Sequence, residues 1–214
     1  MKYSILISSI MIFFVYLLIE VVVRSLFLNM KNNSFNLTTD TVLLMRSFII
    51  IIVFILYLLF TKNIGFTDFI ISYKYLFFFS LIAILILIVE NYILGNISSS
   101  SEEALNIIGI NPKYRIFNIL IFAPIIEEII CRKFLLGKVS EVNIWLGLII
   151  STIIFVVLHF QFNVFNLIFI SIYGLVLGLC YIKTNSVINT IILHMIINTI
   201  QLSLYLLPPY INSK

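Results

Sequence analysis

The chain has 214 residues, of which 62% are hydrophobic and only 10% are charged, with a formal net charge of +4. Soluble domains carry about 25% charged residues, so this composition excludes an ordinary soluble protein and indicates a protein with several membrane spans. The basic residues are spread among the loops, which gives no support to nucleic-acid binding. Anionic lipid headgroups account for them, so membrane lipids are the expected contacts.

Apolar runs long enough to cross about 30 Å of hydrocarbon recur along the chain. We predict an all-α polytopic bundle of about seven transmembrane helices, within a range of about six to eight. The predicted spans are 4–23, 43–61, 75–95, 116–136, 144–162, 164–182 and 186–207. The first run resembles a signal peptide, but it is too long and no small-residue cleavage site follows, so we expect a retained helix.

Three polar segments separate these runs. Residues 63–74 are too short to span, and we expect an interfacial turn there, with a re-entrant segment as the alternative. Residues 29–41 form a polar break, and a second break covers 96–115. Within the second, residues 100–109 (SSEEALNIIG) have capping serines, early acids and a terminal glycine, which predict a short surface helix.

The chain divides into N-terminal transmembrane helices and loops at 1–110 and a core at 111–210, in which polar residues recur at regular spacing within one integrated membrane domain. Basic residues in the loops give a small bias toward a cytoplasmic N-terminus. Abundant Ile, Asn, Phe, Tyr and Lys suit an AT-rich bacterial genome, so we expect a bacterial cell membrane. Cys131 and Cys180 indicate neither a disulfide framework nor a metal knuckle.

The segment 123–134 (APIIEEIICRKF) places three charges inside a predicted span. Each charge would cost about 2.5 to 3.5 kcal/mol at the bilayer centre if it were unpaired. Glu128 and Arg132 are four residues apart and can form an ion pair along one helix face, with either a supporting or a purely structural role. Glu127 is turned about 100° away and has no partner on its own helix. Pro124 can kink the helix just before it.

Both histidines of the chain lie in later spans, each paired at helical spacing with another residue: Phe155 with His159 in FVVLH, and His194 with Asn198 in HMIIN. Taken alone, His159 could reach interfacial water, and His194 with Asn198 could form an interhelical hydrogen-bond pair. Together with a glutamate they can activate water and stabilise an oxyanion, or hold zinc. Glu20 and Glu90 have no comparable set of polar residues at helical spacing around them, and we interpret them as interface-facing or structural.

The motifs EEIICR, FVVLH and HMIIN, in this order, resemble the CPBP intramembrane metalloprotease family. That family includes the type II CAAX prenyl endopeptidases and the bacterial Abi proteins linked to bacteriocin self-immunity. The likeness covers about residues 115–207, and it implies an all-helical membrane peptidase. The residues that match the family motifs are Glu127, Glu128, Arg132, Phe155, His159, His194 and Asn198.

The resemblance also implies a role for each group. Glu127 would be the general base and His159 would orient the water or share its proton, while His194 and Asn198 would stabilise the oxyanion. Glu128 and Arg132 would brace the helix, with Phe155 as a further supporting residue. A zinc ion held by Glu127, His159 and His194 is the alternative to a metal-free mechanism.

We therefore expect an intramembrane endopeptidase that acts on a membrane-associated, hydrophobic or lipidated peptide by glutamate- and histidine-activated water. Because bacteria generally lack prenylated CAAX proteins, the target in a bacterium would be a peptide pheromone, a bacteriocin or a membrane-protein tail. Two other functions stay open: a proton-coupled transporter with a relay of Glu127, His159 and His194, and a non-catalytic immunity or scaffold protein.

Overall fold

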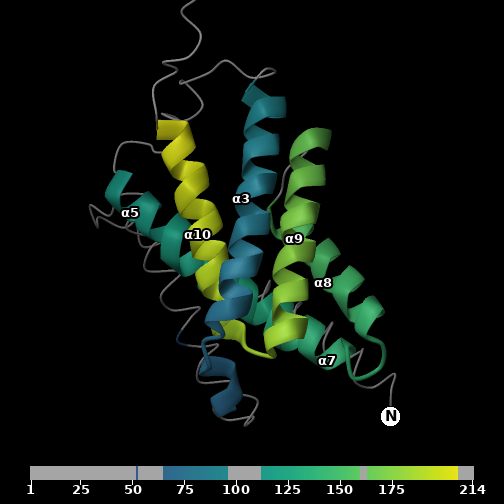
Figure 1. Cartoon of the computed structure of the whole chain (residues 1–214). Coiled ribbons are helices and arrows are strands. Elements are labelled where there is room, and N and C mark those ends of the chain that lie inside the picture. Colours follow the sequence, from purple (N-terminus) through teal and green to yellow (C-terminus); the bar gives the residue numbers. More distant parts are fainter. Residues whose placement is uncertain (1–51, 53–64, 96–111, 160–162, 207–214) are drawn as a thin grey trace, which may run out of the picture.

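The computed structural model describes residues 52, 65–95, 112–159 and 163–206, and these ranges contain helices and turns but no strand (Figure 1). The elements are η1 (Phe66–Phe69), α3 (Tyr73–Gly95), α5 (Pro112–Phe117), η2 (Asn118–Phe122), α6 (Ala123–Glu128), η3 (Ile129–Leu136), α7 (Gly137–Val139), α8 (Ile144–Leu158), α9 (Val164–Thr184) and α10 (Val187–Leu206). The all-α prediction is confirmed for these residues. The predicted spans 4–23 and 43–61 and the predicted surface helix 100–109 lie outside them.

Three described helices are long and apolar enough to cross a membrane: Tyr73–Leu94, Val164–Thr184 and Val187–Leu204. They coincide with the predicted spans 75–95, 164–182 and 186–207, while the predicted total of seven helices is not confirmed. Large apolar side chains cover their outer surface and that of α8; Phe77, Leu85, Ile88, Trp145 and Ile153 are all more than half exposed. Such a surface suits hydrocarbon and not water, so the chain is an integral membrane protein.

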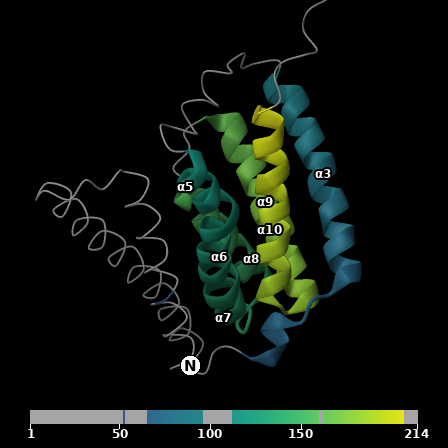
Figure 2. The same cartoon turned by 90° about the vertical axis from the view of Figure 1, so that its left-hand side faces the viewer.

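α3, α9 and α10 contact one another pairwise and run side by side (Figures 1 and 2). α5 to α7 follow one another without a break, and we call residues 112–139 the motif helix because they contain EEIICR. The motif helix packs against α10 and α8. The larger of two apolar clusters among the described residues joins these helices and includes Leu87, Ile130, Phe155 and Leu193. α3 therefore packs in the same core as the segment after residue 110.

The motif helix contains two wide segments, η2 and η3, in which the backbone hydrogen bonds span five residues. In η2 the amide of Ala123 donates to the carbonyl of Asn118. In this register the next residue, Pro124, would pair with Ile119, but proline has no N–H. The carbonyl of Ile119 instead accepts a hydrogen bond of 2.9 Å from Nδ2 of Asn198 in α10. The kink expected at Pro124 thus takes the form of a wide turn completed by a side chain of another helix.

α8 is shorter than its predicted span 144–162. The side chain of Asn143 accepts hydrogen bonds from the amides of Trp145 and Leu146 and thereby starts the helix, which ends at Leu158 after 15 residues. Fifteen residues extend about 22 Å, less than the hydrocarbon thickness of about 30 Å. His159 follows directly as the C-cap residue, and its partly buried side chain faces Glu127 of the motif helix.

The predicted interfacial turn at 63–74 is present in its described part as η1 followed by extended residues up to α3. Phe66 and Phe69 are exposed, whereas Asp68 is buried. Both carboxylate oxygens of Asp68 accept hydrogen bonds from Nζ of Lys133, at 2.7 and 2.6 Å, and its carbonyl accepts one from Oγ of Ser186. These hydrogen bonds therefore connect η1 to the motif helix and to the residue before α10.

Candidate active site

Glu127 lies between the two imidazoles. Its Oε2 atom is 3.8 Å from Nε2 of His159 and 3.9 Å from Nε2 of His194, although the three residues come from the motif helix, α8 and α10. This oxygen is buried and has no hydrogen-bond partner among the described residues. The structure thus brings together the acid and both histidines that the sequence indicated. It also places Glu127 on a different face from Glu128, as the helical geometry predicted.

Each imidazole is fixed through its Nδ1 atom. Nδ1 of His159 lies 2.8 Å from the carbonyl oxygen of Phe155, one helical turn earlier. Nδ1 of His194 lies 3.0 Å from Oε1 of Glu128, a fully buried carboxylate. A carbonyl and an ionised carboxylate can only accept hydrogen bonds, so both Nδ1 atoms carry the proton. In the neutral rings, both Nε2 atoms therefore present a lone pair toward Glu127.

Arg132 and Phe155 contact the groups that hold the two imidazoles in place. Nε of Arg132 donates to Oε2 of Glu128 at 2.9 Å, which confirms the predicted pair at a site where both side chains are 0% exposed. The guanidinium also lies 5.0 Å from the centre of the Phe155 ring. That ring packs against both imidazoles, at 4.6 Å from His159 and 5.5 Å from His194 between centroids. The residues of all three motifs therefore form one connected cluster.

Residues 110–200 match a family model described as type II CAAX prenyl endopeptidase Rce1-like. This segment is Rce1-like. Residues 110–200 contain all three motifs. The match to the family model therefore confirms, for this segment, the resemblance inferred from the motifs. An Rce1-like segment implies a protease of the CAAX type within the membrane. No curated protein and no solved structure matches the chain.

The polar centre of the Rce1-like segment does not have the geometry of a zinc site. Among the described residues, no group of three His, Cys, Asp or Glu side chains could hold a metal ion. Zinc bonds to oxygen and nitrogen are about 2.0 to 2.2 Å long, and tetrahedral ligands subtend about 109°. Ligand atoms 3.8 and 3.9 Å apart, as Oε2 of Glu127 is from the two Nε2 atoms, would require angles of about 140° at the metal. The alternative of a zinc ion on Glu127, His159 and His194 therefore does not fit this arrangement.

Asn198 lies one helical turn after His194 in α10. Its described hydrogen bond is with the backbone of the motif helix. Its Nδ2 atom donates to the carbonyl of Ile119, which Pro124 leaves without a backbone donor. The resemblance gave Asn198 the role of an oxyanion donor. The hydrogen bond points first to a positioning role, because it holds α10 against the wide turn that precedes Glu127.

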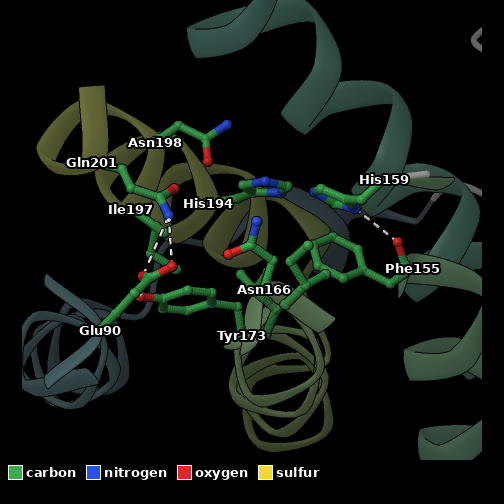
Figure 3. A pocket seen from close by; sticks show the side chains of 11 residues that line it. Glu90, Phe155, His159, Asn166, Tyr173, His194, Ile197, Asn198 and Gln201 are labelled. Atoms are coloured by element: carbon green, nitrogen blue, oxygen red, sulfur yellow. Dashed lines mark hydrogen bonds between the residues drawn. The ribbon is translucent and has the colours of Figure 1, made fainter. Parts of the chain in front are cut away.

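A cavity of about 210 Å³ opens beside the two histidines (Figure 3). It is lined by Glu90, Phe155, His159, Asn166, Ile170, Tyr173, Leu177, His194, Ile197, Asn198 and Gln201. Glu127 is not among the residues that line this cavity, although its side chain is 19% exposed. A substrate in the cavity would meet the rings first.

The sequence analysis missed the polar residues at the far end of the cavity. Glu90 accepts hydrogen bonds from the hydroxyl of Tyr173 and from Nε2 of Gln201. Glu90 is buried, so it does not face the membrane interface. The available signal was an acid within an apolar span.

Proposed function

We propose that this protein is an intramembrane endopeptidase that hydrolyses a peptide bond in a membrane-associated, hydrophobic or lipidated peptide. The observation that carries the proposal is the position of the Glu127 carboxylate oxygen, which faces two imidazole nitrogens inside an apolar helix bundle. The match to an endopeptidase family over residues 110–200 supports the same reaction class.

A water molecule suits the space between these groups. Oε2 of Glu127 and either Nε2 atom are hydrogen-bond acceptors about 3.8 to 3.9 Å apart. A water at about 2.8 Å from both would donate to them at an angle of about 90°, near the angle between its two hydrogens. Its lone pairs would then be free to attack a carbonyl carbon.

The reaction requires one base and one proton donor. As the water oxygen bonds to the substrate carbonyl carbon, its proton passes to Glu127 and the carbonyl oxygen becomes an oxyanion. His159 orients the water through its Nε2 lone pair. When the carbon–nitrogen bond breaks, the proton held by Glu127 passes to the leaving amine, and the carboxylate is restored.

His194 can stabilise the oxyanion in only one protonation state. Because its Nδ1 proton is directed at Glu128, its Nε2 atom can donate a hydrogen bond only in the imidazolium. The Glu128 carboxylate accepts the hydrogen bond from Nδ1 of His194, and Arg132 holds the carboxylate in place. Glu128 and Arg132 therefore act through His194 as positioning residues.

The apolar surroundings indicate the substrate class. The helices around the cavity have apolar outer side chains. A hydrophobic or lipid-modified peptide would therefore concentrate next to this bundle in the membrane, while a soluble peptide would not. In a bacterium, a peptide pheromone, a bacteriocin or a membrane-protein tail meets this requirement.

The test is peptide cleavage by purified protein in lipid vesicles, with a series of quenched fluorescent hydrophobic peptides and mass spectrometry of the products. Glu127→Gln keeps the shape of the side chain but removes the base, and we expect a loss of at least about 1,000-fold, since it removes both the base and the water site. Glu141→Gln, at an exposed turn between α7 and α8, is the matched control and should leave the rate unchanged.

Three outcomes would contradict the proposed function or its mechanism. Cleavage that persists in Glu127→Gln would assign the reaction to other groups. A biological function retained by a well-folded Glu127→Gln protein would favour a non-catalytic immunity or scaffold role, and pH-gradient-driven flux in vesicles that survives Asn198→Ala would favour a transporter.

A further inference from the structure

Glu90 lies at the end of the cavity away from His159 (Figure 3). It belongs to α3 and is 8% exposed, within a helix apolar enough to span the membrane. Its carboxylate accepts a hydrogen bond of 2.5 Å from the hydroxyl of Tyr173 in α9 and contacts Nε2 of Gln201 in α10 at 3.3 Å. An ionisable group at such a position is costly, so its presence in a cavity wall indicates a function.

Among the described residues that line the cavity, the two histidines, His159 and His194, are the basic side chains, and they lie at the opposite end from Glu90. The described residues that line the cavity include no Lys or Arg. Along the three helices that hold Glu90, the basic residues are Lys74, sixteen residues earlier in α3, Lys183, ten residues after Tyr173 in α9, and His194, seven residues before Gln201 in α10. The donors on Glu90 are neutral, so the site lacks the positive charge that would complement an ionised carboxylate.

The helical register gives the distance from Glu90 to the reaction centre. Gln201, which contacts Glu90, and His194, which faces Glu127, are seven residues apart on α10, or about 10 Å along the axis. An extended peptide advances about 3.3 Å per residue. A substrate side chain near Glu90 would therefore lie about three residues from the bond that is cut.

Resting on the proposed peptidase function, we infer that Glu90, held by Tyr173 and Gln201, forms a subsite for a cationic group of the substrate. The ligand chemistry is an ammonium or a guanidinium, about two to four residues from the scissile bond. A basic side chain and a free peptide N-terminus both supply it. A substrate carboxylate at the same position would be repelled.

The test uses hydrophobic quenched peptides that differ at one position, which carries Lys, the uncharged norleucine or Glu, placed two, three or four residues to either side of the cleaved bond. A hydrogen-bonded charge is worth about 1.5 to 3 kcal/mol, which corresponds to a preference of at least about tenfold in kcat/KM for Lys over norleucine at one position. Glu90→Gln should reduce this ratio to less than about twofold, and Glu90→Asp, which keeps the charge, should retain part of it. Glu141→Gln is the matched control for loss of an acid and should retain the full ratio.

The two proposals fail in distinguishable ways. If the wild-type protein cleaves these peptides without a charge preference, or if Glu90→Gln lowers all rates equally, the subsite is overturned while the peptidase function stands. If the wild-type protein cleaves none of them, the peptidase function fails, and binding of fluorescent versions of the same peptides decides the subsite. The subsite is supported if the Lys peptide binds more tightly than the norleucine peptide and Glu90→Gln abolishes this difference. Equal binding of the two peptides overturns the subsite. Acetylation of the peptide N-terminus then distinguishes the two sources of the cation.

Discussion

Glu128 contacts two partners in the interior of the bundle, with one carboxylate oxygen directed at Arg132 and the other at His194. Removal of one member of a buried ion pair typically costs about 3 to 5 kcal/mol, because the remaining charge has lost its partner. We therefore expect Arg132→Leu to lower the free energy of unfolding by about this amount, measured by denaturant titration in detergent.

A double variant separates stability from activity at the same site. Replacing both Glu128 and Arg132 by Leu removes the uncompensated charge and should restore most of the stability. It should not restore cleavage, because Nδ1 of His194 has then lost its carboxylate. An Arg132→Leu protein as stable as the wild type would show that the pair does not brace the site.

Asn198 and Pro124 are linked through the carbonyl of Ile119, although neither residue contacts the other in any described interaction. Asn198→Ala should cost about 1 to 3 kcal/mol, because a partly buried carbonyl loses its donor. Pro124→Ala supplies a backbone N–H at that turn, so in its presence Asn198→Ala should cost clearly less. The double-mutant cycle, read from thermal unfolding in detergent, measures this coupling.

Additive effects of the two substitutions would contradict the positioning role of Asn198. A coupling in stability together with an activity loss in Asn198→Ala that Pro124→Ala does not relieve would instead add a direct role in catalysis. The comparison thus tests whether the asparagine of HMIIN acts on the substrate or on the motif helix.

At the scale of elements, α8 and α9 pack closely because α9 has glycines at their contact. A Cβ atom at Gly178 would lie 2.4 Å from Cδ1 of Leu148 in α8, and one at Gly174 would lie 3.1 Å from Cγ2 of Thr152. This spacing of two small residues four apart is typical of helix contacts within membranes. The contact positions α8, and hence Phe155 and His159, against the rest of the bundle.

Gly178→Ala should therefore destabilise the protein by about 1 to 3 kcal/mol through overpacking. Leu148→Ala in the same chain removes the atom that clashes, so the double variant should be more stable than the sum of the two single changes predicts. Thermal unfolding of the four proteins checks this. Equal stability of Gly178→Ala and the wild type would mean that the Leu148 side chain can move aside at no cost.

The sequence predicted the described helices well where the signal is local. The spans of α3, α9 and α10 follow from length and hydropathy, and the facing of Glu127 and Glu128 follows from helical spacing. The contact of Glu90 with Tyr173 and Gln201 could not be predicted, because the three residues lie far apart in sequence and only the packing of α3, α9 and α10 brings them together. The early end of α8 was also missed, because two further aromatic residues, Phe160 and Phe162, follow Leu158 in the sequence.

At the scale of the whole molecule, the site depends on several helices that each contribute one or two polar side chains to an otherwise apolar bundle. The motif helix supplies the acid, α8 and α10 supply the imidazoles, and α3 and α9 complete the cavity. Such an arrangement brings a few hydrogen-bonding groups together inside an apolar bundle, where the proposed reaction requires one water molecule. We propose that Glu127, His159 and His194 alone hold and activate this water, without a metal ion.

The most direct test of this claim is the cleavage rate of the purified wild-type protein measured together with its metal content, before and after treatment with a strong chelator. We predict an unchanged rate in protein that contains far less than one metal ion per chain. A rate that falls in proportion to the metal removed, and returns when zinc is added back, would contradict the account.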